Sequence, residues 1–300
     1  MVLRLCALMQ APHRIYPKLV LMAVCWSGVF PATRIVLQSM GVFTTVFLRF
    51  WWAAAILLIL LRFRESRLPR LSPRESLLVA GLGLLGITFY NSLFTAGLGL
   101  VEASRASLIV PANPAITAVF AWLFLRERLA GVRAAGTALS VAGALWILCR
   151  GDPSAFVTLE LGVGELLLVL CVFVWSAYTL IGRVALASIS PLALTAYVML
   201  VGSLGVLPPA MLEGDSIARV TVQGWIAMAY LVTFGTVIPF LWYYEGVKEL
   251  GAARAAQFIN LVPPLAVAES VVLLGEPVTP ALLVGIGLVV VGLYLTNRPR

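Results

Sequence analysis

Long apolar stretches separated by short polar connections make up most of the sequence. Ten of these stretches are long enough to cross the hydrocarbon core of a bilayer, which takes about 20 helical residues. The predicted spans are 17–37, 42–62, 76–100, 104–125, 131–149, 162–186, 190–212, 223–247, 252–274 and 280–296. Their apolar residues are continuous and do not alternate with polar ones, as the strands of a membrane β-barrel would require. The pattern therefore predicts an all-α membrane protein with ten transmembrane helices.

The composition indicates that lipid is the main solvent of this chain. Hydrophobic residues make up 61% and charged residues only 11%, whereas a soluble domain carries about 25% charged residues. The net charge of +8 does not indicate a nucleic-acid partner, because the basic residues crowd into loops and no soluble body presents them. The expected partners are membrane lipid and a small-molecule substrate, without nucleic acid, and no oligomeric state is predicted.

The distribution of Lys and Arg predicts the orientation. With a cytoplasmic N-terminus, sixteen of these residues fall at the inner ends of the spans and four at the outer ends. The positive-inside rule therefore predicts that both termini are cytoplasmic. The first apolar stretch is long enough to span and no small-residue cleavage site follows it, so an uncleaved helix is expected instead of a signal peptide. The predicted location is the inner (plasma) membrane.

The two halves of the sequence match each other in register. A shift of 149 residues aligns them without an insertion and places Trp26-Ser27 on Trp175-Ser176. The other matched pairs are Arg34 and Arg183, Gly97 and Gly246, Ala103 and Ala252, Arg105 and Arg254, Ala106 and Ala255, Pro114 and Pro263, Leu125 and Leu274, Glu127 and Glu276, Gly136 and Gly285, and Gly143 and Gly292. Shared hydrophobicity does not explain matched Trp, Arg, Pro and Glu, so two repeats are expected, at 1–149 and 150–300.

Each repeat holds five predicted spans, an odd number, so the second repeat enters the membrane from the opposite side. Inverted repeats related by an axis in the membrane plane are an architecture of secondary transporters, because exchanging the conformations of the two halves exposes a central site to each side in turn. A passive scaffold has no need of this symmetry. The repeat is therefore the strongest indication of transport by alternating access.

A doubled motif resembles the EamA family of the drug/metabolite transporter superfamily. Its first copy runs Ala103-x-x-Ala106, Pro114, Leu123-Phe124-Leu125-Arg126-Glu127, Gly136 and Gly143, and its second runs Ala252-Ala253, Pro263, Leu273-Leu274-Gly275-Glu276, Gly285 and Gly292. The phrase Ala23-Val24-Cys25-Trp26-Ser27 is similar to the start of the family's first helix, whereas Arg126 stands where the family usually has a small residue. The resemblance implies a cavity lined by the first, third, fourth, sixth, eighth and ninth helices and amino acids or similar metabolites as cargo.

Polar and aromatic side chains inside the spans are the candidates for substrate binding, because they should face away from lipid. The candidates are Trp26, Phe30, Tyr90, Asn91, Trp175, Tyr178, Trp242, Tyr243, Gln257 and Asn260. Trp26 and Trp175 are repeat mates that lie deeper than an interfacial belt, so they either line the cavity or pack in the core. Gln257, Asn260 and Pro264 share one helical face, and the alternative role of the two amides is hydrogen bonding between helices.

Prolines and charges inside the spans are further candidates. Pro111 and Pro114 in one repeat and Pro263 and Pro264 in the other, with Pro114 matching Pro263, are expected to form fixed kinks or gating kinks beside the cavity. Glu269 lies deep in its span and is a possible proton site, unless it points away from the cavity and is paired. Arg49 is expected to snorkel towards the membrane surface, and Glu245 is expected to form an ordinary surface pair with Lys248.

An exporter of small amphipathic metabolites, with amino acids as the expected cargo, is the function that these patterns favour. A multidrug or nucleotide-sugar carrier is the alternative, and phosphate cargo is disfavoured because lysine occurs only at Lys18 and Lys248. An intramembrane enzyme is disfavoured because the four cysteines and single histidine form no metal or catalytic motif, and both aspartates lie in loops. No metal or other cofactor is expected, and no phosphate-binding loop couples transport to ATP.

The predicted orientation can be tested by single-cysteine labelling in intact cells. In a cysteine-free background, Leu68→Cys in the loop between Arg62 and Arg74 should react with a membrane-impermeant reagent only after the cells are opened, because five arginines hold this loop inside. Labelling in intact cells would overturn both the orientation and the inversion of the repeats.

Overall fold

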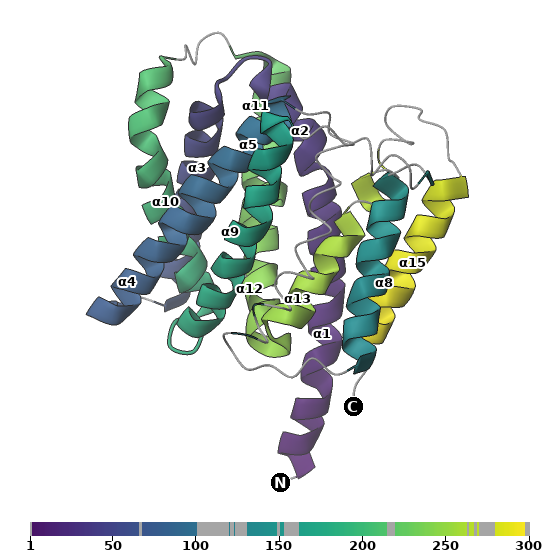
Figure 1. Ribbon diagram of the computed structural model, residues 1–300. Helices are drawn as coiled ribbons and strands as arrows, with labels where there is room; N and C mark the ends of the chain where they lie inside the picture. The colour runs from purple at the N-terminus through teal and green to yellow at the C-terminus, as the bar shows by residue number, and fades with distance from the viewer. Residues whose placement is uncertain are drawn as a thin grey trace.

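Helices that pack side by side make up the described part of the computed structural model (Figure 1). The structure describes residues 2–65, 68–100, 120, 123, 131–148, 151–152, 162–214, 220–262, 264–266, 269 and 280–297, with the backbone alone for 2–14. The first half contains α1 (Val2–Ser27), α2 (Val29–Leu37), α3 (Val42–Glu65), α4 (Pro73–Leu82), the π-helical turn η1 (Gly83–Phe89), α5 (Tyr90–Leu100) and α8 (Gly131–Leu148). The second half contains α9 (Val163–Ala185), α10 (Pro191–Glu213), α11 (Val222–Val232), the π-helical turn η5 (Thr233–Val237), α12 (Ile238–Leu250), α13 (Ala252–Gln257), the 3₁₀ turn η6 (Phe258–Leu261) and α15 (Pro280–Asn297).

Among the residues that the structure describes, six helical segments are long and apolar enough to cross a membrane. They are Ile15–Leu37, Val42–Arg64, Pro73–Leu100, Leu166–Ala185, Pro191–Glu213 and Val222–Leu250, and they agree with six predicted spans to within a few residues. Helices α8 and α15 cover the predicted spans 131–149 and 280–296. The predicted span 104–125 lies outside the described residues except for 120 and 123, and 252–274 is described only in part. The chain is therefore a multi-pass helical membrane protein, and the described residues do not by themselves give the count of ten.

Helices related by the 149-residue shift take equivalent places in the bundle. Helix α3 packs against its mate α10, and α8 packs against its mate α15 (Figure 1). Helix α1 packs on α12, and the equivalent pair, α9 and α5, is also in contact. The carboxylate of Glu213, at the end of α10, accepts hydrogen bonds from the N–H groups of Phe43 and Thr44 at the start of α3, at 2.9 and 2.7 Å. The mates α3 and α10 therefore run in opposite directions.

The first predicted span is broken at Gly28, between α1 and α2. The Tyr230 hydroxyl of α11 donates to the carbonyl of Cys25 at 2.9 Å. A Cβ at position 28 would lie 2.2 Å from this hydroxyl, so only glycine leaves room for the tyrosine. A side chain that enters the backbone ladder is a recognised cause of a helix kink. The break therefore follows from a contact with a distant helix.

A pair of glycines tests how tightly the helices pack. A Cβ at Gly202 in α10 would lie 2.2 Å from the Cβ of Ile87 in η1, whereas a Cβ at Gly81 meets nothing within 4 Å. We expect Gly202→Ala to lower the free energy of unfolding by about 1–3 kcal/mol through overpacking. The control Gly81→Ala should raise it by roughly 0.5–1 kcal/mol, because alanine is the better helix former. Thermal unfolding of the two purified variants measures both effects, and equal melting temperatures would contradict this packing.

Candidate functional site

A cavity of about 60 Å³ lies among helices of both halves, and together with the open space at its mouth it comprises about 500 Å³. Its lining residues are Trp26 of α1, Val29 and Phe30 of α2, Arg49 of α3, Tyr90, Asn91 and Phe94 of α5, Trp175 of α9, Phe240 of α12, Ile259 of η6, and Val262. Ligand sites for small molecules typically have mostly apolar walls with a few polar groups. The cavity therefore suits a small, largely apolar ligand.

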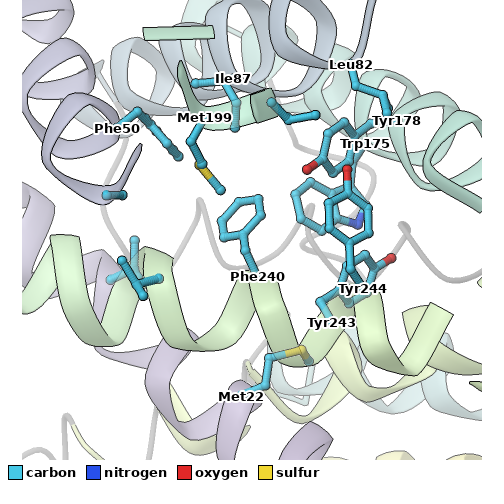
Figure 2. Close-up of a cluster of buried hydrophobic side chains, with 14 of the residues drawn as sticks. Met22, Phe50, Leu82, Ile87, Trp175, Tyr178, Met199, Phe240, Tyr243 and Tyr244 are labelled. Atoms are coloured by element: carbon cyan, nitrogen blue, oxygen red, sulfur yellow. The ribbon is translucent and has the colours of Figure 1, made fainter. Parts of the chain in front are cut away.

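Aromatic rings form the wall on the side of α9 and α12. The aromatic cluster consists of Trp26, Tyr90, Trp175, Phe240 and Tyr243, with Trp175 at its centre. The centroid of the Trp175 ring lies 4.9 Å from that of Tyr90, 5.3 Å from Tyr243, 5.5 Å from Trp26 and 5.9 Å from Phe240. Figure 2 shows the Phe240 ring between Trp175 on one side and Phe50 and Met199 on the other. Tilted and edge-to-face contacts of this kind stabilise aromatic pairs beyond the burial of their surface.

Five of the predicted binding residues line this cavity. They are Trp26, Phe30, Tyr90, Asn91 and Trp175. The repeat mates Trp26 and Trp175 also contact each other, with their ring planes at 81°. The 149-residue match therefore pointed to two side chains that meet at the wall of one cavity, although their part in binding remains a prediction.

Three other predicted aromatics lie outside the cavity lining. Tyr178 is fully buried and its ring lies next to that of Trp175, at 5.4 Å between centroids. Tyr243 is also fully buried and shares a hydrogen bond of 2.8 Å with the hydroxyl of Thr179. Trp242 is partly buried and packs against the core. In this conformation Tyr178 and Tyr243 support the cavity wall from behind.

The two predicted amides form a network between helices. Gln257 of α13 donates from Nε2 to the Thr137 hydroxyl of α8 at 3.1 Å, and Asn260 of η6 donates from Nδ2 to Gln257 Oε1 at 3.5 Å. Both amides are fully buried and neither lines the cavity. Their contacts agree with the alternative role given to them above, which is hydrogen bonding between helices. Pro264 is buried, and Pro111, Pro114 and Pro263 lie outside the described residues.

Two predicted carboxylates have partners on other helices. Glu269 is partly buried and accepts a hydrogen bond of 2.5 Å from the Ser27 hydroxyl at the end of α1. Glu245 pairs with Lys18 of α1, at 2.5 Å between Oε2 and Nζ. The predicted pairing of Glu245 with Lys248 is therefore wrong, because α1 packs on α12 and brings Lys18 against Glu245.

Arg49 does not snorkel, and this prediction is wrong as well. Only 5% of its surface is exposed, and it lines the cavity. Its Nε donates to the Thr236 hydroxyl at 2.6 Å and its Nη2 to the carbonyl of Gly235 at 2.8 Å. The guanidinium carbon also lies 5.0 Å from the centre of the Phe50 ring. These contacts hold the cation inside the bundle, away from the membrane surface.

The π-helical turns explain why Arg49 and Asn91 point where they do. Gly86 in η1 and Gly235 in η5 are repeat mates, and a side chain donates to the carbonyl of each. Asn91 donates to Gly86 at 2.8 Å from its own helix, and Arg49 reaches Gly235 from α3. π-Helical turns often mark functional sites. Here both turns adjoin the cavity.

The sequence contained a signal for Arg49 that the snorkelling hypothesis did not use. Ionisable residues inside spans usually face the interior of the bundle or a water-filled cavity. Arg49 lies well inside its span, and its repeat mate is Val198, so a charge appears where the repeat breaks its own symmetry.

The apolar helices and the repeated helix pairings define a multi-pass helical membrane protein, and comparisons with known proteins give its family. A profile described as the EamA-like transporter family matches the chain twice, over 14–149 and 162–298. The chain belongs to the EamA-like transporter family.

Several curated relatives are named as transporters. The chain is 30% identical over 282 residues to a probable terminal-alkyne amino-acid exporter of Streptantibioticus cattleyicolor, covering 93% of this chain and 92% of the relative. It is 28% identical over 251 residues to the uncharacterized transporter YyaM of Bacillus subtilis, covering 83% and 82%. A crystal structure with 20% sequence identity matches it with a TM-score of 0.74, covering 95% of this chain and 96% of the other. That last likeness concerns the fold alone.

The two central tryptophans provide a test of the cavity. We expect Trp26→Ala and Trp175→Ala to reduce transport, because each removes a large part of the aromatic wall. Trp175 is 2% exposed, so Trp175→Phe should accompany it to keep the packing. Trp52→Ala is the control, since Trp52 is 52% exposed and lies outside the cavity. Transport at wild-type rates in both cavity variants, measured on correctly folded protein, would show that the tryptophans serve packing only.

Proposed function

We propose that this protein exports small amphipathic metabolites, amino acids above all, by alternating access. The observation that carries the proposal is the cavity lined by helices of both halves, at the contact of the repeat mates Trp26 and Trp175. The named amino-acid exporter from Streptantibioticus cattleyicolor supports the choice of cargo. The wall of aromatic rings with two polar groups suits a molecule that has an apolar body and one polar end.

The proposed architecture is two inverted repeats of five helices, at 1–149 and 150–300, in the inner membrane with both termini in the cytoplasm. The antiparallel packing of the mates α3 and α10 supports the inversion. So does the recurrence of the contact between α1 and α12 in the contact between α9 and α5. An arrangement of this kind opens to the two sides of the membrane in turn when the halves exchange conformations.

We also propose that Glu269 is the site of proton coupling, if transport is coupled at all. Its carboxylate accepts a hydrogen bond from Ser27, the neighbour of Trp26, at the break between α1 and α2. Protonation and deprotonation of Glu269 would change its hydrogen bond with Ser27, which lies at one end of the cavity wall. Pro264, which lies in the same segment, belongs to the proposed gating kinks.

The alternative cargo classes fit the cavity less well. A nucleotide sugar carries two negatively charged phosphate groups, whereas Arg49 is the single cationic side chain among the described lining residues. A multidrug carrier for cations would expose its cargo to that same positive charge. The family and its named relatives are transporters and not enzymes.

Flux into proteoliposomes tests the proposal. We expect radiolabelled amino acids with apolar side chains to exchange across vesicles that contain the purified protein, at rates well above those of protein-free vesicles. Cationic drugs and a nucleotide sugar, offered at the same concentrations, serve as competitors and should inhibit weakly. Transport of a labelled cationic drug or nucleotide sugar by the same vesicles, without any flux of amino acids, would overturn the proposed cargo.

A further inference from the structure

Arg49 is the charged side chain of the cavity wall among the described residues. No carboxylate of the described ranges lies within 4 Å of its guanidinium. Taking a charge out of water without a counter-charge is unfavourable, so buried charges are normally paired. The protein therefore holds a cation at its cavity whose counter-charge does not come from the described chain.

The contacts of Arg49 orient its guanidinium. An arginine has five N–H donors in a planar fork. The bonds to Thr236 and Gly235 use Nε and one N–H of Nη2, and Thr236 is itself held because its hydroxyl donates to the carbonyl of Leu231 at 2.7 Å. No partner among the described residues meets Nη1. The end of the fork formed by Nη1 and Nη2 is the geometry that binds both oxygens of a carboxylate.

We propose that Arg49 binds the carboxylate of the substrate, and that the cavity selects small carboxylates with an apolar body. The inference rests on the proposed function to the extent that it takes the cavity as the substrate site. Asn91, the amide side chain of the lining, already donates to the carbonyl of Gly86. The described lining offers no carboxylate to a substrate amine. The acid group, and not the amine, is therefore the feature of an amino acid on which recognition depends.

A matched ligand panel tests this selectivity on wild-type protein. The probes are L-phenylalanine and L-leucine, their amides, 3-phenylpropionate and phenethylamine. Binding is measured by the shift in thermal unfolding, because a ligand that binds only the folded state stabilises it. We expect the two amino acids and 3-phenylpropionate to bind, and the amides and phenethylamine to bind roughly 10- to 100-fold more weakly, as loss of a charge-assisted bidentate contact requires.

Substitutions at Arg49 separate recognition from structure. Arg49→Gln keeps a donor for the Gly235 carbonyl without the charge, and it should bind acids and amides alike. Arg49→Lys keeps the charge without the fork and should retain part of the preference for acids. Arg64→Gln, at the exposed end of the same helix, is the control that loses a charge outside the cavity and should behave as wild type.

A double variant guards against simple misfolding. The repeat mates of Arg49 and Asn91 are Val198 and Phe240. The double variant combines Arg49→Val, which removes the charge, with Phe240→Asn, which supplies an amide. This amide can donate to the Gly235 carbonyl in the way that Asn91 donates to the Gly86 carbonyl in the first half. If Arg49 serves only this carbonyl, the double variant should fold and still prefer acids over amides. Our proposal predicts a folded protein that has lost the preference.

The outcomes distinguish this inference from the proposed function. Binding of carboxylates that depends on Arg49, without flux, would support the inference and overturn the function. Flux of amino acids with equal affinity for acids and amides, unchanged in Arg49→Gln, would overturn the inference and leave the function standing. Wild-type protein that neither binds nor moves any carboxylate of the panel would overturn both.

Discussion

Inside the bilayer every peptide carbonyl needs a donor from the protein, and this constraint decides where the polar side chains of the cavity lie. The π-helical turns present the carbonyls of Gly86 and Gly235 at equivalent places in the two halves. Asn91 donates to the first from its own helix. Its mate Phe240 has no donor, so the second carbonyl receives its hydrogen bond from Arg49 on another helix. The charge at the cavity is therefore linked to the loss of an amide at position 240.

The break in the first helix shows the same departure from symmetry. Tyr230 fits against Gly28 and takes the carbonyl of Cys25. The repeat mate of Tyr230 is Gly81, which has no side chain to insert. The repeat mate of Gly28 is Ala177, and α9 continues through Ala177 without a break. Of these two matching spans, the first is interrupted at Gly28, two residues after Trp26, and the second is continuous. One insertion of a side chain is enough to make two helices of matching sequence differ in shape.

Six spans could be predicted because they depend on local hydrophobicity, and the repeat singled out Trp26 and Trp175 as candidates for the cavity wall. The break at Gly28, the partner of Glu245 and the hydrogen-bond partners of Arg49 could not, because each depends on a residue far away in the sequence. Lys18 lies 227 positions from Glu245, and Arg49 lies 187 positions from Thr236. Snorkelling was a reasonable expectation for an arginine two turns inside a helix, but it took no account of the helix packed against it.

A carrier built from two inverted repeats has to satisfy two demands that conflict. The repeats must resemble each other for their conformations to be exchanged at little cost, whereas a substrate with one polar end has no such symmetry. In this protein the pair in contact at the cavity, Trp26 and Trp175, is conserved between the repeats, and the polar position Arg49 is paired with Val198. The tryptophan that packs at the cavity therefore occurs in both repeats, whereas the charged residue occurs in only one of them. Because Arg49 of the first half is held by Thr236 of the second, the departure lies at the contact between the halves, where the proposed substrate site is.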